Sequence, residues 1–365
     1  MNSESLESLE CLEGPEGFNI VVNQPSLSVD GPKSNKPWKY LSKFQVTCQG
    51  LEKVRCPVYA NGRQQIPIQI NIEARDEDGV VVDVNHGRLY LNLVLYDDVE
   101  AFPSGLGRSG TEDPRFIYQW TTENLLATAG ESEHESVPSE GVESIQTVKQ
   151  FVTANKVGTY KLGARCRSPG WVLFTTNTPN PPEGKFDSWV LVDARQPVAI
   201  GWDKFAITSP RDAHNSGPLD VDLYYVYFND KDNTALKIVD SIHYSAAPDT
   251  CHYAWIKGSF RMEQAAFRAL HKRLVTYSSC GYSATFFVGE RSGAADVGRI
   301  RNSNGKPCGN MSYHHGLVGY INQYGNESKV VIRASSDGNT ISLGNPSRPD
   351  DSAPPVDEEA GSADA

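Results

Sequence analysis

Short alternating apolar segments between Val54 and Tyr96 constrain the fold of this chain more than any other feature of its sequence. Isoleucines at 66, 68, 70 and 72 alternate with polar residues, and the dipeptides Asn61-Gly62 and Asp78-Gly79 flank that segment. Such dipeptides supply the positive φ angles of tight hairpins, and a period of two places one strand face in a core and the other in water. The run therefore predicts one sheet, built as a meander.

Further strands are expected later in the chain. Regular alternation resumes at Ile145, a strong strand pattern covers Val221–Phe228, and Asp337-Gly338 predicts a hairpin between Val330–Ile332 and Thr340–Leu343. A short helical turn is expected at Thr122–Ala127. We predict one amphipathic helix over Phe260–Leu274, because five apolar residues fall on one helical face: Met262, Ala266, Phe267, Leu270 and Leu274. The fold class is mostly β.

Length and charge predict the domain organisation. A chain of 365 residues is long enough for two or three domains. Three segments rich in Glu and Asp, at 1–36, 129–144 and 347–365, together carry more negative charge than the net −11 of the whole chain, and we expect them to be flexible. The remaining body is nearly neutral, so neither nucleic acid nor a membrane surface is an expected partner. We predict a sandwich region over 37–203 and a second β-rich domain over 204–346.

The sequence also gives expectations about location and thiols. No run of residues approaches the length of an apolar membrane helix, and the N-terminus is acidic where a signal peptide is basic. We therefore expect no stable membrane span, and either a cytoplasmic protein or export by a leaderless route. Seven cysteines without close pairs favour buried, reduced thiols, with a bridge Cys48–Cys56 or Cys280–Cys308 as the alternative.

Two strands carry a resemblance to a known family. The Gly158–Cys166 segment is similar to a late strand of immunoglobulin-like modules in bacterial surface proteins, and Ile66–Ile72 before its Asp-Gly turn looks like one of their middle strands. The resemblance covers roughly residues 40–203. It departs from antibody-type domains, because Tyr160 precedes Cys166 by six residues and no Cys…Trp…Cys spacing is present. It implies an immunoglobulin-like antiparallel sandwich of bacterial origin that acts as an interaction or spacer scaffold, with no catalytic residues.

The region from residue 204 onward is the predicted site of function. Aromatic residues crowd it, interleaved with Asn, Ser and His, and amphipathic rings of this kind suit recognition of carbohydrate or protein. The alternative is that many of these rings face a β core. The expected ligand-binding residues are Tyr253, Trp255, Tyr282, Tyr313, His314 and Tyr320.

No complete catalytic, cofactor or metal motif accompanies these aromatics. Cys251-His252 and His314-His315 lack the spacing that directs two side chains to one ion, and Cys280 lies in no recognised nucleophile motif. The leading hypothesis is a non-enzymatic binding protein, without cofactor or metal, that presents its Tyr/His-rich domain to a protein or glycan. The alternatives are a bacterial toxin or effector, possibly membrane-active, and a hydrolase using Cys280 or a metal.

Overall fold

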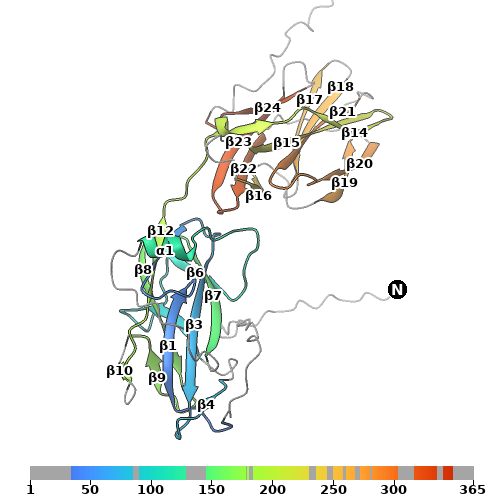
Figure 1. Ribbon diagram of the computed structural model, residues 1–365. Coiled ribbons are helices and arrows are strands. Elements are labelled where there is room, and N and C mark those ends of the chain that lie inside the picture. The colour runs from blue at the N-terminus through green and yellow to red at the C-terminus, as the bar shows by residue number, and fades with distance from the viewer. Residues whose placement is uncertain are drawn as a thin grey trace, which may run out of the picture.

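The computed structural model describes residues 34–84, 90–128, 145–177, 179–180, 184–229, 236–244, 250–257, 260–267, 272–279, 282–302, 316–334 and 340–347. The expected acidic segments fall almost wholly outside these ranges. Two β units lie end to end, one formed by strands up to residue 195 and the other by strands from residue 205 (Figure 1). We call them the first and second β unit. The mostly β prediction is confirmed, whereas division into independent domains at 203/204 stays a prediction.

The first β unit consists of two main sheets that share one core. The first sheet has the order β1-β3-β7-β6, with β4 paired to β3. Its strands are antiparallel: β1 (Tyr40–Cys48), β3 (Ile66–Arg75), β4 (Val81–Val82), β6 (Leu106–Ser109) and β7 (Gln146–Ala154).

The second sheet of this unit has the order β2-β12-β8-β5, with β9 paired to β8. It contains one parallel pair, β2 with β12, among otherwise antiparallel neighbours. Its strands are β2 (Arg55–Tyr59), β5 (Asn92–Leu95), β8 (Gly158–Arg167), β9 (Leu173–Thr175) and β12 (Val190–Arg195). A two-stranded ribbon joins β10 (Pro179–Asn180) to β11 (Gly184–Lys185).

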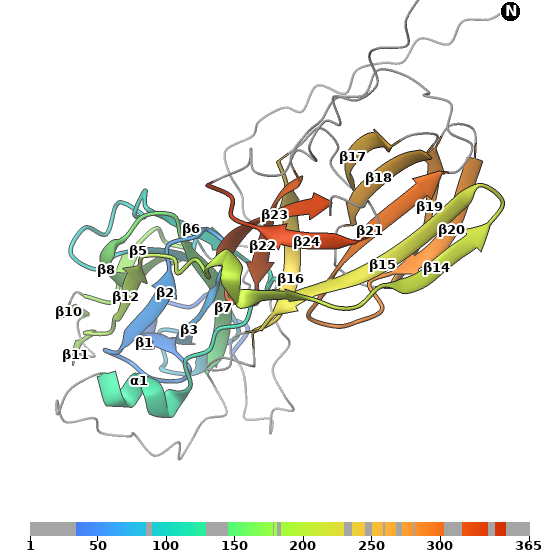
Figure 2. The same cartoon turned by 90° about the horizontal axis from the view of Figure 1, so that it is seen from above.

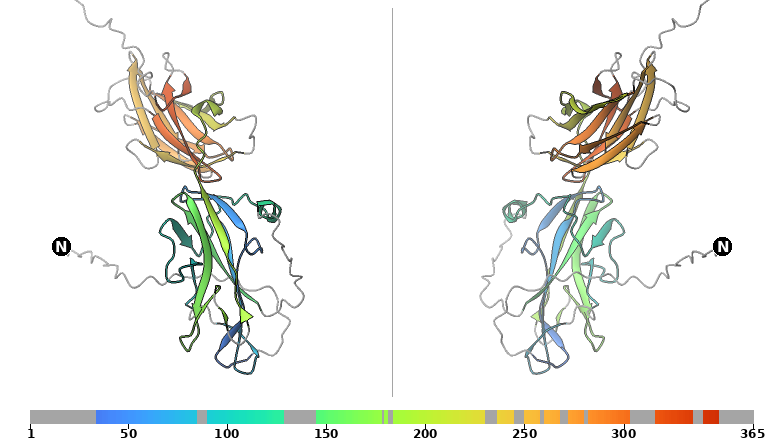
Figure 3. Two further views of the ribbon diagram at one scale, coloured as in Figure 1. Left: turned by 90° about the vertical axis from the view of Figure 1, so that its left-hand side faces the viewer. Right: turned by 90° about the vertical axis from the view of Figure 1, so that its right-hand side faces the viewer.

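The inward faces of both sheets build the core of the first unit. β3 alternates buried and half-buried positions along its whole length, as its isoleucines predicted. Phe44 on β1 and Leu162 on β8 belong to the same cluster of buried side chains. The helix α1 (Thr122–Thr128) lies beside the strands (Figure 3). Its Leu125 is fully buried in that cluster. The predicted helical turn at Thr122 is thus confirmed.

The expected meander over Val54–Tyr96 is only partly correct. The Asp78-Gly79 hairpin forms, since β4 pairs with β3 and Gly79 has a φ of 79°. Gly62 also adopts a positive φ, yet β2 and β3 on either side of it belong to different sheets. The Asn61-Gly62 turn therefore carries the chain across the sandwich. A turn dipeptide specifies local backbone angles, and packing decides which sheet receives the next strand.

The second β unit is built around one long antiparallel sheet, β13-β15-β21-β18-β17, with β14 paired to β15 (Figure 2). Its strands are β13 (Phe205–Ile207), β14 (Arg211–Ser216), β15 (Leu219–Phe228), β17 (Thr250–Lys257), β18 (Phe260–Phe267) and β21 (Ala295–Asn302). A 3-10 turn at Trp202–Lys204 precedes it.

A second sheet of this unit, β16-β22-β23-β24, contains β16 (Ile238–His243), β22 (Gly316–Asn322), β23 (Glu327–Ala334) and β24 (Ile341–Gly344). The remaining hairpin is β19 (Arg273–Ser279) with β20 (Tyr282–Val288).

The long sheet packs on both of its faces. On β15, Leu219, Val221 and Leu223 belong to one buried cluster with the β19–β20 hairpin. Tyr224 and Val226 belong to another cluster, shared with β16, β22 and β23. Alternate residues of a strand point to opposite faces of its sheet. The first cluster takes odd-numbered residues of β15 and the second takes even-numbered ones, so the two cores lie on opposite sides of the sheet. The strand predicted at Val221–Phe228 is therefore confirmed and serves both cores.

The predicted helix at Phe260–Leu274 is wrong. Residues 260–267 form β18, which lies between β17 and β21, and 273–279 form β19. The apolar residues had the spacing of a helical face, but two neighbouring strands offer residues 260–267 hydrogen-bond partners on both sides. Pairing of this kind overrides a short local pattern.

Polar contacts hold the two units together. The Asn61 side-chain amide donates to Tyr324 O and to Asn326 Oδ1, both at 2.9 Å, and Ile117 N donates to Gln323 O at 2.9 Å. Gly325 lies at the tip of the facing turn with a φ of 77°, and a Cβ there would approach Arg63 Cβ to 2.8 Å. Both the left-handed backbone and the close approach therefore require glycine.

Candidate functional site

An exposed pair of stacked aromatic rings marks the most distinctive surface of the first unit. The rings of Tyr90 and Trp171 have centroids 5.5 Å apart and an interplanar angle of 29°. Tyr90 is 61% exposed and Trp171 65% exposed. Large rings usually reduce their contact with water, so two of them stacked in solvent form a surface suited to contact with another molecule.

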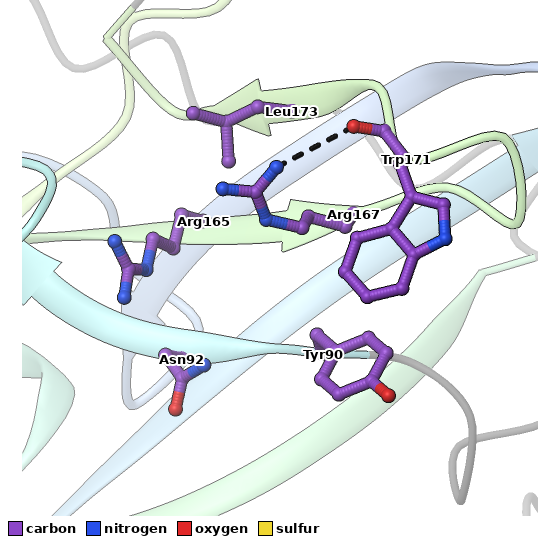
Figure 4. A pocket seen from close by; sticks show the side chains of 6 residues that line it. All are labelled: Tyr90, Asn92, Arg165, Arg167, Trp171 and Leu173. Atoms are coloured by element: carbon purple, nitrogen blue, oxygen red, sulfur yellow. Dashed lines mark hydrogen bonds between the residues drawn. The ribbon is translucent and has the colours of Figure 1, made fainter.

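Strand pairing explains how residues 81 positions apart in the sequence meet. Asn92 on β5 lies opposite Arg165 on β8, and continuing this antiparallel register places Tyr90 opposite Arg167. Arg167 is in turn the partner of Leu173 on β9. The hairpin between β8 and β9 brings Trp171 over the same strands (Figure 4).

The turn that presents Trp171 is hydrogen-bonded through Ser168. Trp171 N donates to Ser168 O at 2.8 Å, Ser168 N donates to Val172 O at 3.0 Å, and Val172 N donates to Ser168 Oγ at 3.1 Å. Trp171 has a φ of 64°, in the left-handed region that favours glycine. A bulky residue in this region costs on the order of 1–3 kcal/mol and is found where the surroundings or a function require it.

A hollow of about 140 Å³ lies beside the ring pair. Its lining comes from three neighbouring strands and the hairpin turn: Tyr90, Asn92, Arg165, Arg167, Trp171 and Leu173 (Figure 4). The outward positions of β8 supply both arginines, while Ala164 and Cys166 between and beside them are buried in the core. The hollow thus combines apolar ring surface with guanidinium and amide groups.

The two arginines differ in how their charge is compensated. Arg165 Nη1 donates to Glu100 Oε2 at 2.6 Å and to Val99 O at 2.9 Å. Arg167 Nη1 donates to Trp171 O at 3.5 Å, and no carboxylate of the residues that the structure describes comes within 4.0 Å of it. Arg167 therefore retains donors and a positive charge for a ligand, whereas Arg165 helps to fix the geometry of the site.

Of the expected site residues of the second unit, only Tyr282 and Tyr320 have described side chains, and these two differ in exposure. Tyr253 and Trp255 lie on β17, opposite Gln264 and Met262 of β18. Tyr282 is exposed at the start of β20. Tyr320 on β22 is only 1% exposed and its ring lies 5.8 Å from that of Phe205, so Tyr320 is a core residue. Tyr313, His314 and Cys280 lie outside the described residues, and the proposed roles of Tyr253, Trp255 and Tyr282 stay predictions.

Sequence reasoning missed Tyr90 and Trp171 as site residues. One local signal was present: Trp171 follows Ser168-Pro169-Gly170, and a tryptophan at the tip of a hairpin has little core to enter. Arginines four and six residues before it are a second signal. Tyr90 had no comparable signal, because its position next to Trp171 depends on the pairing of β5 with β8.

Buried thiols lie beneath the surface of this unit. Cys48, Cys56 and Cys166 are free thiols, and all three are buried as predicted. Burial raises the pKa of the Cys166 thiol. Contact with Cys48, together with burial, raises the pKa of Cys56, and the Cys48 thiol lies 4.0 Å from Tyr118 Oη. Cys56 and Cys166 are therefore protonated packing residues at neutral pH.

In the ranges that the structure covers, no three His, Cys, Asp or Glu side chains are grouped to hold a metal ion. No helix within those ranges is long and apolar enough to cross a membrane.

Comparisons with known proteins give only distant structural neighbours. No protein-family model matches the chain, and no curated protein matches it. The chain is similar to the Yersinia pseudotuberculosis adhesin InvE, with 9% identity over 79% of this chain and a TM-score of 0.19, and it spans 59% of that protein. It is also similar to domains 5–6 of the S-layer protein SbsC, with 11% identity, 80% of this chain and 98% of that one covered, and a TM-score of 0.18. These structural neighbours are bacterial surface proteins.

Proposed function

We propose that this protein is a non-enzymatic recognition protein that binds a carboxylate-bearing glycan through the Tyr90–Trp171 pair. The observation that carries the proposal is the stacked, solvent-exposed ring pair beside Arg167, whose guanidinium has no carboxylate partner among the described residues. Aromatic faces contact the C–H surface of a sugar ring, and a guanidinium donates two parallel hydrogen bonds to a carboxylate. In this proposal the first unit is an immunoglobulin-like scaffold that carries the binding surface itself.

The backbone at Trp171 supports this assignment. A glycine would occupy the left-handed position without strain, yet this position holds a tryptophan, the most exposed aromatic ring among the residues that the structure describes. Because the Trp171 ring is exposed, its burial in a core does not offset the conformational strain of the backbone. A ligand that stacks on the indole supplies a reason for the residue.

The proposal is tested by a glycan array that contains matched neutral and carboxylated sugars, probed with the full chain. Trp171→Ala and Tyr90→Ala should each abolish binding, and Arg167→Gln should weaken binding to the carboxylated member of each pair more than to the neutral one. Tyr282→Ala, an exposed aromatic of the second unit, is the matched control and should bind like the wild type.

Other outcomes would contradict the proposal in distinct ways. Loss of binding in Tyr282→Ala with retention in Trp171→Ala would move the site to the second unit, as the sequence alone predicted. Binding of no glycan, with capture of an acidic peptide that depends on Trp171 and Arg167, would replace the glycan with a protein partner.

A further inference from the structure

A second and larger hollow lies at the junction of the two units. Its volume is about 420 Å³, within the range of small-ligand pockets. Pro114 and Arg115 line it from the first unit, Lys237–Val239 line it from the start of β16, and the turn from Gly289 to Ala294 closes it between β20 and β21. Segments of both units thus form its walls.

The carboxylates around this cleft already have cationic partners. Arg115 forms ion pairs with Asp113 and with Asp240, each at 2.7 Å, and the second of these pairs crosses the junction. Glu290 pairs with Arg211 at 2.7 Å and with Lys272 at 2.9 Å. The negative charges near the cleft are therefore compensated by side chains of the protein itself.

Two cations at the cleft are not compensated in this way. Within the described parts of the chain, neither Lys237 nor Arg291 has a carboxylate within 4.0 Å, and both side chains are exposed. The guanidinium carbon of Arg291 lies 4.5 Å from the ring centre of Tyr227 and 5.7 Å from that of Tyr225. Stacking on two rings restricts the rotamers of this arginine, so less conformational entropy is lost when its donors bind an acceptor.

We propose that the junction cleft binds a small anion carrying phosphate or carboxylate groups, with Arg291 as the bidentate contact and Lys237 as the second charge. Two positive charges in a cleft of this size favour an anion with at least two negative charges. The site is separate from the Tyr90–Trp171 surface and does not depend on the function proposed for it. Since Arg115 lines the same cleft, a bound anion contacts both units and stabilises their junction.

Isothermal titration calorimetry on the full chain at low ionic strength tests this proposal, with inorganic pyrophosphate and citrate as probes. Arg291→Gln and Lys237→Gln should each weaken binding of the better probe about tenfold or more, in line with loss of a charged hydrogen bond. Arg291→Lys, which keeps the charge without the planar fork, should also weaken it. Lys329→Gln is the matched control, because Lys329 lies 4.4 Å from the Tyr244 ring and outside the lining of the cleft.

The two probes distinguish the sources of the anion: tighter binding of pyrophosphate indicates a phosphorylated ligand, and tighter binding of citrate a polycarboxylate. Hydrogen exchange gives a second readout on wild-type protein, in which the bound probe should slow exchange in segments 113–117 and 289–294. Absence of binding by both probes at millimolar concentration would overturn the proposal. An equal loss of affinity in Lys329→Gln would overturn it as well, because that result indicates a diffuse charge effect.

Discussion

The two β units bury the apolar faces of their strands in different ways. The first unit encloses one core between two sheets, so each of its strands has one inward face. The second unit has a central sheet with a core on each side, one shared with β16, β22 and β23 and the other with the β19–β20 hairpin. Truncation of a buried side chain in the first unit should therefore destabilise the whole sandwich. In the second unit it should destabilise only one side of the central sheet.

The largest expected effect is on the single core of the first unit. Phe44 is fully buried there, and Phe44→Ala should lower the free energy of unfolding of this unit by about 3–5 kcal/mol. Urea unfolding, with hydrogen exchange to assign the change to segments, measures it. Faster exchange should appear in both sheets of the first unit together; a change confined to β1 and β3 would contradict a shared core.

The two cores of the second unit should respond separately. Leu219→Ala removes a fully buried side chain from the core under the β19–β20 hairpin, and Ile238→Ala removes one from the core under β16 and β22. Each should cost about 2–5 kcal/mol. Hydrogen exchange should accelerate in β19–β20 for Leu219→Ala and in β16, β22 and β23 for Ile238→Ala. Identical exchange maps for the two variants would show that the cores act as one.

A substitution at the exposed ring pair should affect binding much more than stability. Trp171→Gly relieves the left-handed backbone but removes the stacking on Tyr90, so the free energy of unfolding should stay within about 1 kcal/mol of the wild type. Trp38→Ala, a buried tryptophan of the same unit, should cost about 3–5 kcal/mol. Equal destabilisation by both, measured in urea, would make Trp171 a structural residue.

Two carboxylates, one in each unit, should contribute to the pH dependence of stability with opposite signs. In the first, the hydrogen bond with Arg115 lowers the pKa of Asp113. The unfolded chain then holds this proton more tightly, so the pair stabilises the protein above the unfolded pKa of about 3.9, and this stability is lost as pH falls through the lower folded value. Asp113→Asn should reduce the loss of stability below pH 4 by up to about 1 kcal/mol.

In the second unit, burial raises the pKa of Asp296, which Arg211 and Gly289 N contact. The folded state then holds the proton of Asp296 more tightly than the unfolded chain does. The protonated carboxyl group therefore adds to the free energy of unfolding below the unfolded pKa, and this stabilisation is lost as pH rises through the higher pKa of the folded state. In urea titrations between pH 3 and 7, the contribution of Asp296 lowers the free energy of unfolding of the wild type as pH rises. This decline should be absent in Asp296→Asn. Parallel profiles for Asp113→Asn and Asp296→Asn would contradict the opposite signs.

Much of the strand content could be predicted from the sequence, because alternation along β3 and the Asp78-Gly79 turn are local signals. The sheet that each strand joins could not, and Asn61-Gly62 shows why: the same turn angles suit a hairpin and a crossing between sheets. Residues 260–267 show the opposite case, in which strand partners far along the chain override a local helical pattern. The binding surface depends on strand register, so Tyr90 and Trp171 meet only after β5 and β8 have paired.

The position of β12 also has a mechanical consequence. This strand lies between β2, which runs parallel to it, and β8, which runs antiparallel, and the chain continues from its end into the segment that leads to the second unit. A pulling force applied through that segment would load the end of β12 directly. Because β12 is hydrogen-bonded to β2 on one side and to β8 on the other, the strand that receives such a load would be anchored along both of its edges.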